Sequence, residues 1–327
     1  MLFIIITMSL LSLLLLASAS LAQETALLTG GFNGYEGGRE GCELLNSACP
    51  VPSFPVNVPG TGSGREDHIT DITEDGLILS CGGESGDGTD HLSCIYMDVA
   101  TGAWVTHSIL NAVRLMATSV ALPGIGLFII GGFKELSTEL LPVGATEWEM
   151  GPTLPGTLDT VSYYGICSVM LTPMEFMVIG GESEGILGGT LVQTYSAETG
   201  EWASWEDLSV SRWGHSCTRL GDQVIVAGGV SPLFTILDSA TVLDLNTREE
   251  RQVGKLLGAR AWFGMATIDG KALAFGGMSP LRDQYRNILE LDMETEEWVE
   301  RENTMETARG ISSFASVVVE QSIICGL

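Results

Sequence analysis

The sequence predicts an all-β fold, a β-propeller of six four-stranded antiparallel blades, because glycine doublets, apolar runs and turn signals recur together along it. Successive doublets begin 48 to 52 residues apart, and a short apolar run precedes each one. A repeat of about fifty residues is typical of propeller blades. The doublets are Gly30-Gly31, Gly82-Gly83, Gly131-Gly132, Gly180-Gly181, Gly228-Gly229 and Gly276-Gly277.

The repeat around the fifth doublet shows how one blade is built. Residues 213–220 alternate as a half-buried strand does, and Gly221-Asp222 is a turn signal. Residues 223–227 form the apolar strand that runs into the doublet, and residues 239–245 form a third strand. Asn246-Thr247 then opens the turn to a fourth strand. Four strands joined by tight turns make one blade.

The turn between the third and fourth strands has its own repeat. An aspartate or serine is followed three residues later by a threonine and six residues later by a tryptophan. The side chains at the first two positions, aspartate or serine and then threonine, bond the backbone of the turn. The tryptophan offers a large apolar surface to the neighbouring blade. The triplets are Asp98, Thr101 and Trp104; Ser196, Thr199 and Trp202; and Asp292, Thr295 and Trp298. Asp244 and Thr247 repeat the first two members without the tryptophan.

This combination of apolar run, glycine doublet, aspartate-led turn and tryptophan resembles the kelch repeat family over nearly all of the mature chain. The resemblance implies a kelch-type propeller, similar to the central domain of galactose oxidase. Such rings close by mixing strands from both ends of the chain, so we expect residues 310–319 to join a blade whose other strands begin at Ala26. Residues 321–327 leave open an extra edge strand or a partial seventh blade.

The first residues predict a secretory signal peptide over 1–22, followed by one propeller domain over 23–327. Leu2 to Leu16 is apolar, and small residues suited to a peptidase follow it. The alternative is an uncleaved membrane anchor, since the stretch is nearly long enough to span a bilayer. We therefore expect a secreted, extracellular protein that contacts no membrane unless this segment is retained.

The charge of the chain argues against nucleic-acid binding. The formal net charge is −26 at pH 7, and residues 1–22 carry none of it. A surface this acidic repels phosphate backbones, whereas it suits a soluble protein or one with cationic partners.

Seven cysteines in an exported chain predict disulfides. Cys81 and Cys94 flank the second doublet at positions that face each other on neighbouring strands, so we expect them to be bridged. Cys42 has two possible partners: Cys325, in a bridge that closes the ring, or Cys49, in a local loop. We expect Cys167 and Cys217, at inner-strand positions, to be buried thiols.

Arginines recur sixteen or seventeen residues before the doublets, at the entry to the inner strand, and are the candidate binding residues of the chain. In one interpretation they form a cationic ring that grips a carboxylate or an acidic peptide. In the other, each arginine bonds carbonyl groups of a neighbouring turn. Residues 230–238 are a second candidate, an apolar contact loop. The arginines are Arg65, Arg114, Arg212 and Arg260, with Arg309 in the same relation to Gly326.

Metal and cofactor chemistry is not expected. Four histidines are too sparse for a converging metal site, and we expect His68 and His215 to lie in the core. The acidic loop at 84–90 lacks the ligand pattern of a calcium loop. No phosphate loop or zinc-protease motif is present.

These observations favour a protein-binding module without catalysis, whose protein partner the sequence does not identify. The alternative on the same fold is a lectin-like binder or an enzyme acting on carbohydrate or sialic acid, with the arginines gripping the sugar carboxylate. Copper chemistry of the galactose-oxidase kind is disfavoured because the required histidines and tyrosines are not matched.

Overall fold

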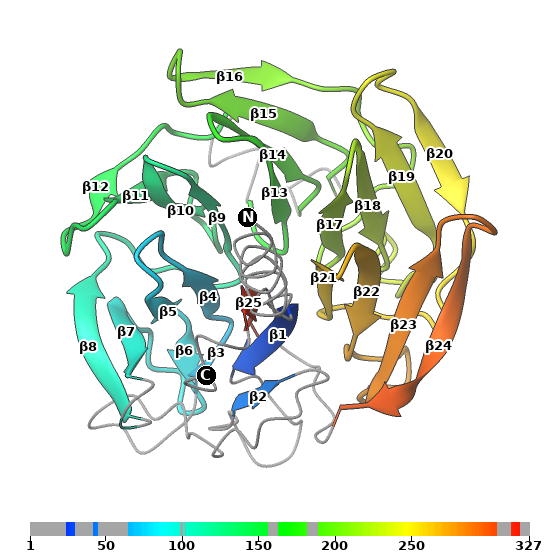
Figure 1. Ribbon diagram of the computed structural model, residues 1–327, viewed down its shortest axis with the longest axis horizontal. Coiled ribbons are helices and arrows are strands. Elements are labelled where there is room, and N and C mark those ends of the chain that lie inside the picture. Colours follow the sequence, from blue (N-terminus) through cyan, green and yellow to red (C-terminus); the bar gives the residue numbers. More distant parts are fainter. Residues whose placement is uncertain are drawn as a thin grey trace, which may run out of the picture.

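The computed structural model describes most of the ring as strands and turns. In the described part of the chain every regular element is a β-strand, and the sheets are arranged around a central axis (Figure 1). The prediction of an all-β propeller is therefore confirmed. No helix there is long and apolar enough to cross a membrane. The described residues are 24–29, 42–44, 65–98, 101, 103–155, 163–181, 189–305 and 315–320.

Five sheets have four antiparallel strands each, and each blade is named here by its innermost strand. The β4 blade contains β4 (Ile69–Ile72), β5 (Ile78–Cys81), β7 (Ser93–Asp98) and β8 (Ala103–Ile109). The β9 blade contains β9 (Thr118–Leu122), β10 (Gly126–Ile130), β11 (Thr138–Pro142) and β12 (Glu149–Met150). The β13 blade contains β13 (Cys167–Thr172), β14 (Glu175–Ile179), β15 (Val192–Ser196) and β16 (Glu201–Ser204).

The two remaining four-stranded blades follow the same order. The β17 blade contains β17 (Ser216–Leu220), β18 (Gln223–Ala227), β19 (Ala240–Asp244) and β20 (Glu250–Val253). The β21 blade contains β21 (Gly264–Ile268), β22 (Lys271–Phe275), β23 (Asn287–Asp292) and β24 (Glu297–Thr304). A separate two-stranded ribbon joins β3 (Arg65–Glu66) to β6 (Glu84–Ser85) beside the β4 blade.

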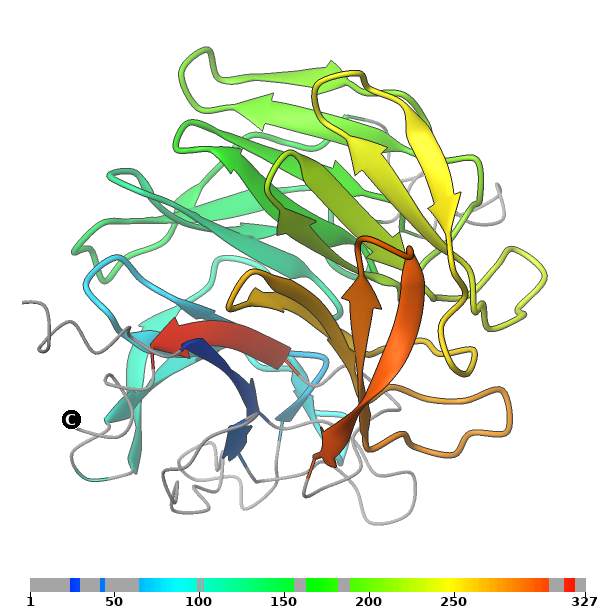
Figure 2. The ribbon, with the colours of Figure 1, turned by 45° about the vertical axis from the view of Figure 1, so that its right-hand side comes forward.

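The two ends of the chain meet in one sheet. Strand β1 (Glu24–Thr29) pairs antiparallel with β2 (Cys42–Leu44) and with β25 (Ala315–Glu320), as Figure 2 shows for β1 in blue and β25 in red. Strand β25 also contacts β4 and β21, so six innermost strands form a closed ring. The expected pairing of the two ends is confirmed. Six four-stranded blades are not, since this sheet has three strands in the described residues, and residues 321–327 lie outside them.

Strand alternation gives the ring two distinct faces. Within a blade, the first strand runs away from the end where its arginine lies, and the second strand returns to it and ends at the glycine doublet. The loops that follow the doublets and the connections between blades therefore share one side, which we call the loop face. The turns between first and second strands, and between third and fourth strands, lie on the opposite face.

The core lies between neighbouring blades. Ile225 and Val242 of the β17 blade pack with Leu289 and Trp298 of the β21 blade in one buried cluster. Burial of this kind contributes roughly 25 cal/mol for each Å² of apolar surface removed from water. The position of Trp298 agrees with the predicted role of the repeated tryptophan as a contact between blades.

The predicted aspartate-led turns are also present. The Asp244 carboxylate accepts hydrogen bonds from the backbone N–H groups of Asn246 and Thr247, both at 2.9 Å. These donors lower the pKa of Asp244, because they favour its charged form. The Asp292 carboxylate accepts the matching bonds from Glu294 and Thr295 in the β21 blade.

Two disulfides lie in the described residues, and one of them corrects the prediction. Cys81 on β5 stands directly opposite Cys94 on β7 and is bonded to it, as predicted. Cys167 and Cys217 were expected to be thiols, and this was wrong: they form a second disulfide. They occupy neighbouring inner strands β13 and β17, which bring their Cα atoms to 6.0 Å. Cys49 and Cys325, the two proposed partners of Cys42, lie outside the described residues.

Candidate interaction face

The repeated arginines are internal parts of the blades. All four that the structure describes have exposed fractions of 0%. Each Nη1 donates a hydrogen bond to the carbonyl of the first glycine in its own doublet, at 2.7 to 3.1 Å. The pairs are Arg65 with Gly82, Arg114 with Gly131, Arg212 with Gly228, and Arg260 with Gly276.

A second set of bonds ties each arginine to the start of the third strand. Arg65 and Arg212 donate to the backbone carbonyls of Ser93 and Ser239, and both also reach the serine hydroxyls. Burial lowers the pKa of Arg65, Arg212 and Arg260 to about 10, which leaves all three charged at neutral pH. A buried guanidinium with these partners holds the doublet against the strand that follows it.

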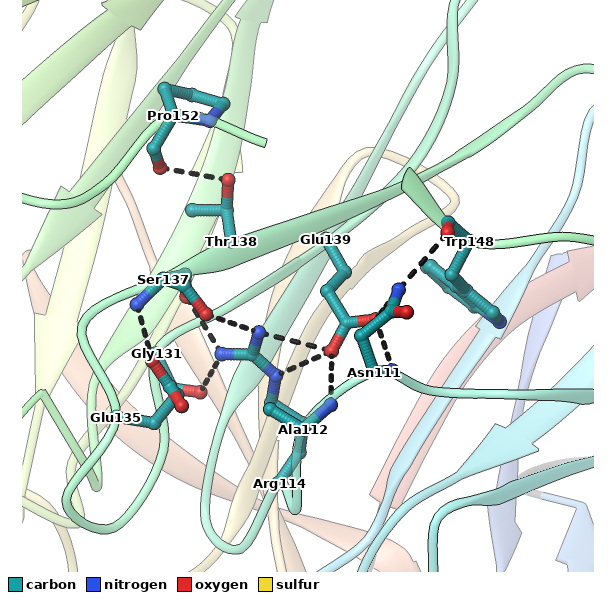
Figure 3. Close-up of polar contacts among 10 residues, drawn as sticks. All are labelled: Asn111, Ala112, Arg114, Gly131, Glu135, Ser137, Thr138, Glu139, Trp148 and Pro152. Carbon is teal, nitrogen blue, oxygen red and sulfur yellow. Dashed lines mark hydrogen bonds and ion pairs between the residues drawn. The ribbon is translucent and has the colours of Figure 1, made fainter. Parts of the chain in front are cut away.

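Arg114 has an additional anionic partner, shown in Figure 3. Its Nη2 lies 3.1 Å from an oxygen of Glu139, and both side chains are fully buried. Glu139 also accepts hydrogen bonds from the backbone N–H groups of Asn111 and Ala112, at 2.7 and 3.1 Å. The carboxylate thus joins the entry segment at 111–114 to strand β11 in the β9 blade.

The geometry favours the structural interpretation of the arginines over the ligand-gripping one. Their Nη groups donate to carbonyls, serine hydroxyls and Glu139, and the four arginines have no access to solvent. Arg309 lies outside the described residues.

The described entry segments are also linked by a chain of four backbone hydrogen bonds around the channel. The residue two positions after each arginine, or after Tyr163 in the β13 blade, has a positive φ. In each of these residues after Asp67, the N–H donates to the carbonyl of the equivalent residue in the preceding blade, at 2.8 to 3.0 Å. The chain of bonds runs from Trp262 to Gly214, Gly165, Met116 and Asp67.

The channel contains a cavity of about 300 Å³ between the inner strands. Its lining includes Asp71, whose carboxylate accepts a bond from the Ser119 hydroxyl at 2.7 Å and whose pKa burial raises. It also includes His215, whose pKa burial and the nearby Arg212 lower to about 3. A base this weak is poorly matched to proton abstraction near neutral pH.

The histidines fit the core role predicted for two of them. His68 and His215 are both buried in the inner part of the ring. His215 Nε2 lies 3.3 Å from Cys167 Sγ, so it packs against the disulfide. Within the described ranges, no three side chains of His, Cys, Asp or Glu converge in a way that would hold a metal ion.

Two loop tips on the loop face expose leucines in a matching way. The tip at 231–235 carries Leu233 and the tip at 279–283 carries Leu281, with exposed fractions of 82% and 84%. We call them the twin tips, because each begins Ser-Pro-Leu and follows a glycine doublet by one residue. The first lies within the predicted contact loop at 230–238. The second was missed, although the repeated tripeptide is visible in the sequence.

The twin tips have the same hydrogen bonds. In the first, the Ser231 N–H donates to the Thr235 carbonyl at 2.8 Å, and the Phe234 N–H donates to the Ser231 carbonyl at 2.9 Å. In the second, the Ser279 N–H donates to the Asp283 carbonyl at 2.8 Å, and the Arg282 N–H donates to the Ser279 carbonyl at 2.9 Å. The serine hydroxyls accept the N–H groups of Leu233 and Leu281 as well. Each leucine is therefore presented on an ordered turn.

A groove of about 520 Å³ runs beside the twin tips. Its lining includes Trp213 and Trp262, whose rings meet edge to face at a centroid distance of 5.3 Å. Tyr164 and Phe133 extend this aromatic row across the next two blades, with centroid separations of 5.7 and 5.4 Å. Val230, Ile236 and Met278 add apolar lining. The face is thus apolar over the β17 and β21 blades.

The corresponding loop of the β4 blade is acidic. It spans 84–90, and its closing bond, from the His91 N–H to the Gly83 carbonyl at 2.8 Å, matches those from Leu237 to Gly229 and from Tyr285 to Gly277. Glu66 on β3 stands opposite Glu84 on β6. Burial, together with the nearby Asp67 and Glu84 carboxylates, raises the pKa of Glu66 to about 7.

No protein-family model matches this chain, and comparison with curated proteins yields no significant match. The assignment of function therefore depends on the geometry of the loop face.

Proposed function

We propose that this protein is a secreted, kelch-type β-propeller that binds another protein through its loop face and carries out no catalysis. A β-propeller is compatible with a protein-interaction module. The observation that carries the proposal is the pair of twin tips, which hold Leu233 and Leu281 in solvent on matching turns beside an aromatic groove.

Exposure of this kind has a physical cost that a binding role explains. Large apolar side chains contribute most when they leave water, and contiguous apolar patches on a protein surface mark interaction sites. Phe234 is 70% exposed beside Leu233, so the patch extends beyond the two leucines. Because the tips are hydrogen-bonded turns on a rigid ring, they lose less conformational entropy when a partner binds than mobile loops would.

The kelch-type and extracellular parts of the proposal have separate support. The glycine doublets, aspartate-led turns and tryptophans recur in register, and they occupy equivalent places in the blades. Two intramolecular disulfides are compatible with an extracellular protein, since such bonds persist in oxidising surroundings. The alternative function, recognition of a sugar acid, depends on accessible arginines, and the burial of the four described ones gives it no support.

The proposal is tested by affinity capture from extracellular fluid, with the mature chain as bait. A twin-tip variant, Leu233→Ser with Leu281→Ser, removes both exposed apolar groups from the loop face. A matched control, Met174→Ser with Val299→Ser, removes two exposed apolar groups elsewhere: Met174 lies in the β13–β14 turn on the opposite face, and Val299 lies on outer strand β24.

We expect the parent chain and the control variant to retain the same partner and the twin-tip variant to lose it. Equal retention by all three chains would contradict a role for the twin tips. Turnover of a sugar acid by the parent chain, with no protein retained, would favour the enzyme instead.

A further inference from the structure

The two disulfides in the described residues have different surroundings. Cys81 and Cys94 are bridged within one blade and are 1% and 0% exposed. Cys167 and Cys217 join two blades, are 8% and 7% exposed, and both line the channel cavity of about 300 Å³. We propose that the Cys167–Cys217 disulfide is an exchangeable bond, which a small thiol opens by attacking the Cys217 sulfur from the channel. The proposal goes beyond the proposed function, because it requires no protein partner.

The position of this bridge between two blades follows from the strand register. Cys167 stands opposite Ile179, the last residue before its doublet, whereas Cys217 stands opposite Val226, the second residue before the next doublet. Side chains alternate between the two faces of a strand, so this offset of one residue directs the two cysteines toward opposite faces of their blades. They therefore meet in the space between β13 and β17, beside the channel.

His215 places a hydrogen-bond donor on one of the two sulfurs. Its Nε2 lies 3.3 Å from Cys167 Sγ, and a disulfide sulfur has no proton, so the imidazole N–H donates this bond. Burial and the nearby Arg212 lower the pKa of His215 to about 3, which keeps the ring neutral with a single N–H near pH 7. Nδ1 has no hydrogen-bond partner among the described residues, so the N–H is better placed at Nε2.

Packing alone does not require a donor at this position. A Cβ at Gly180 would lie 2.5 Å from His215 Cε1, just as one at Gly228 would lie 2.6 Å from Phe263 Cε1. An apolar ring thus fills the equivalent space in the next blade, and phenylalanine is a suitable replacement with which to remove the donor. From the β4 blade to the β21 blade, this slot holds His68, Ala117, Ile166, His215 and Phe263.

The donor determines the direction of the exchange. The thiolate of the small thiol attacks Cys217 Sγ, a new S–S bond forms there, and the Cys167 sulfur leaves as a thiolate that accepts the hydrogen bond from His215. A stabilised thiolate is the better leaving group, so attack on Cys217 is faster than attack on Cys167.

A second small thiol completes the reduction. Its thiolate attacks the small-molecule sulfur of the mixed disulfide, which releases Cys217 and a small-molecule disulfide. Two electrons pass to the protein as two small thiols are oxidised, and the two protons that they lose end on Cys167 and Cys217.

The test uses the oxidised chain of residues 23–327 under native conditions, with reduced glutathione as the small thiol. Samples are quenched with acid at successive times, and peptide mass spectrometry measures the opening of each bridge and the position of the glutathione adduct. The Cys81–Cys94 bridge of the same chain is the matched control. His215→Phe removes the donor, and His215→Gln retains an N–H group on a side chain of similar reach.

We expect the Cys167–Cys217 bridge to open about tenfold or more faster than Cys81–Cys94, with the first adduct on Cys217. His215→Phe should slow this opening about threefold to tenfold and let adducts form on both cysteines, whereas His215→Gln should retain more of the parent rate. The opening rate of Cys81–Cys94 should be the same in all three chains.

Equal opening rates of the two bridges in the parent chain would mean that the sulfurs are reached only when the ring unfolds, and would overturn the proposal. A first adduct on Cys167 would overturn the direction of attack, and so would an unchanged rate and adduct position in His215→Phe. If His215→Phe fails to fold, the two rates and the adduct position in the parent chain decide the question.

Discussion

Replacing Arg114 by methionine tests whether the repeated arginines are structural. Methionine keeps much of the apolar bulk of the side chain but removes its charge and all its donors. In the parent chain the guanidinium donates five hydrogen bonds at 2.7 to 3.2 Å, two of them to Glu139. The substitution leaves Glu139 fully buried without its cation and the Gly131 and Ser137 carbonyls without this donor.

The expected cost is large because the pair is buried. Removing one member of a buried ion pair typically destabilises a protein by about 3–5 kcal/mol. Arg251 provides the matched control. Its Nη1 lies 3.0 Å from an oxygen of Glu296, nearly the same separation, but both side chains of this pair are partly exposed. Because solvent screens such a pair, Arg251→Met should cost less than about 1 kcal/mol.

The assay is urea-induced unfolding of the oxidised chain, followed by tryptophan fluorescence, together with capture of the partner by each folded variant. We expect Arg114→Met to lower the free energy of unfolding by about 3–5 kcal/mol while the folded fraction still binds the partner. If stability stays within about 0.5 kcal/mol of the parent while partner binding is lost, the arginines form a binding ring and the structural interpretation is refuted.

Three further substitutions test other parts of the account. The pKa of Glu66 is raised from 4.5 to about 7, so the folded state holds the proton more tightly and stability falls as pH rises through this interval. Glu66→Gln should therefore raise the melting temperature at pH 8 by an amount equivalent to about 1–2 kcal/mol and leave it nearly unchanged at pH 5. Identical melting temperatures of the variant and the parent chain at both pH values would contradict this. Gly82 has a φ of +67°, and a Cβ there would lie 2.6 Å from the Arg114 carbonyl oxygen. Gly82→Ala should therefore lower the free energy of unfolding, measured by thermal unfolding, by about 2 kcal/mol or more. An unchanged stability would show that the doublet tolerates a side chain. The pair Cys167→Ala and Cys217→Ala should lower stability by up to about 4 kcal/mol for a loop of 50 residues, and free thiols at both positions in the purified parent chain would exclude the bridge.

The repeat pattern was sufficient to predict the architecture because each signal has a local cause. A doublet marks a backbone that approaches the entry segment of the next blade, as the clash predicted for Gly82 with Arg114 shows. An aspartate such as Asp244 closes its turn within three residues, and Cys81 meets Cys94 inside one blade. Interactions of this kind are encoded over short stretches of sequence.

Features that depend on how blades meet were harder to predict. Cys167 and Cys217 come together only when strands β13 and β17 become neighbours in the ring, although their separation of 50 residues matches the repeat and places them at nearly equivalent inner-strand positions. The burial of Arg212 likewise depends on three-dimensional packing, although its regular spacing was visible. The predicted contact loop was recognised from its apolar residues, whereas its partner tip around Leu281 required the two loops to be compared.

Amide hydrogen exchange of residues 23–327, with and without a captured partner, tests the central claim most directly. If the loop face is the binding surface, residues 230–238 and 278–286 become protected on binding, while the opposite-face turn at 172–175 exchanges as in the free chain. Protection confined to the opposite face, with both twin tips unchanged, would contradict the account.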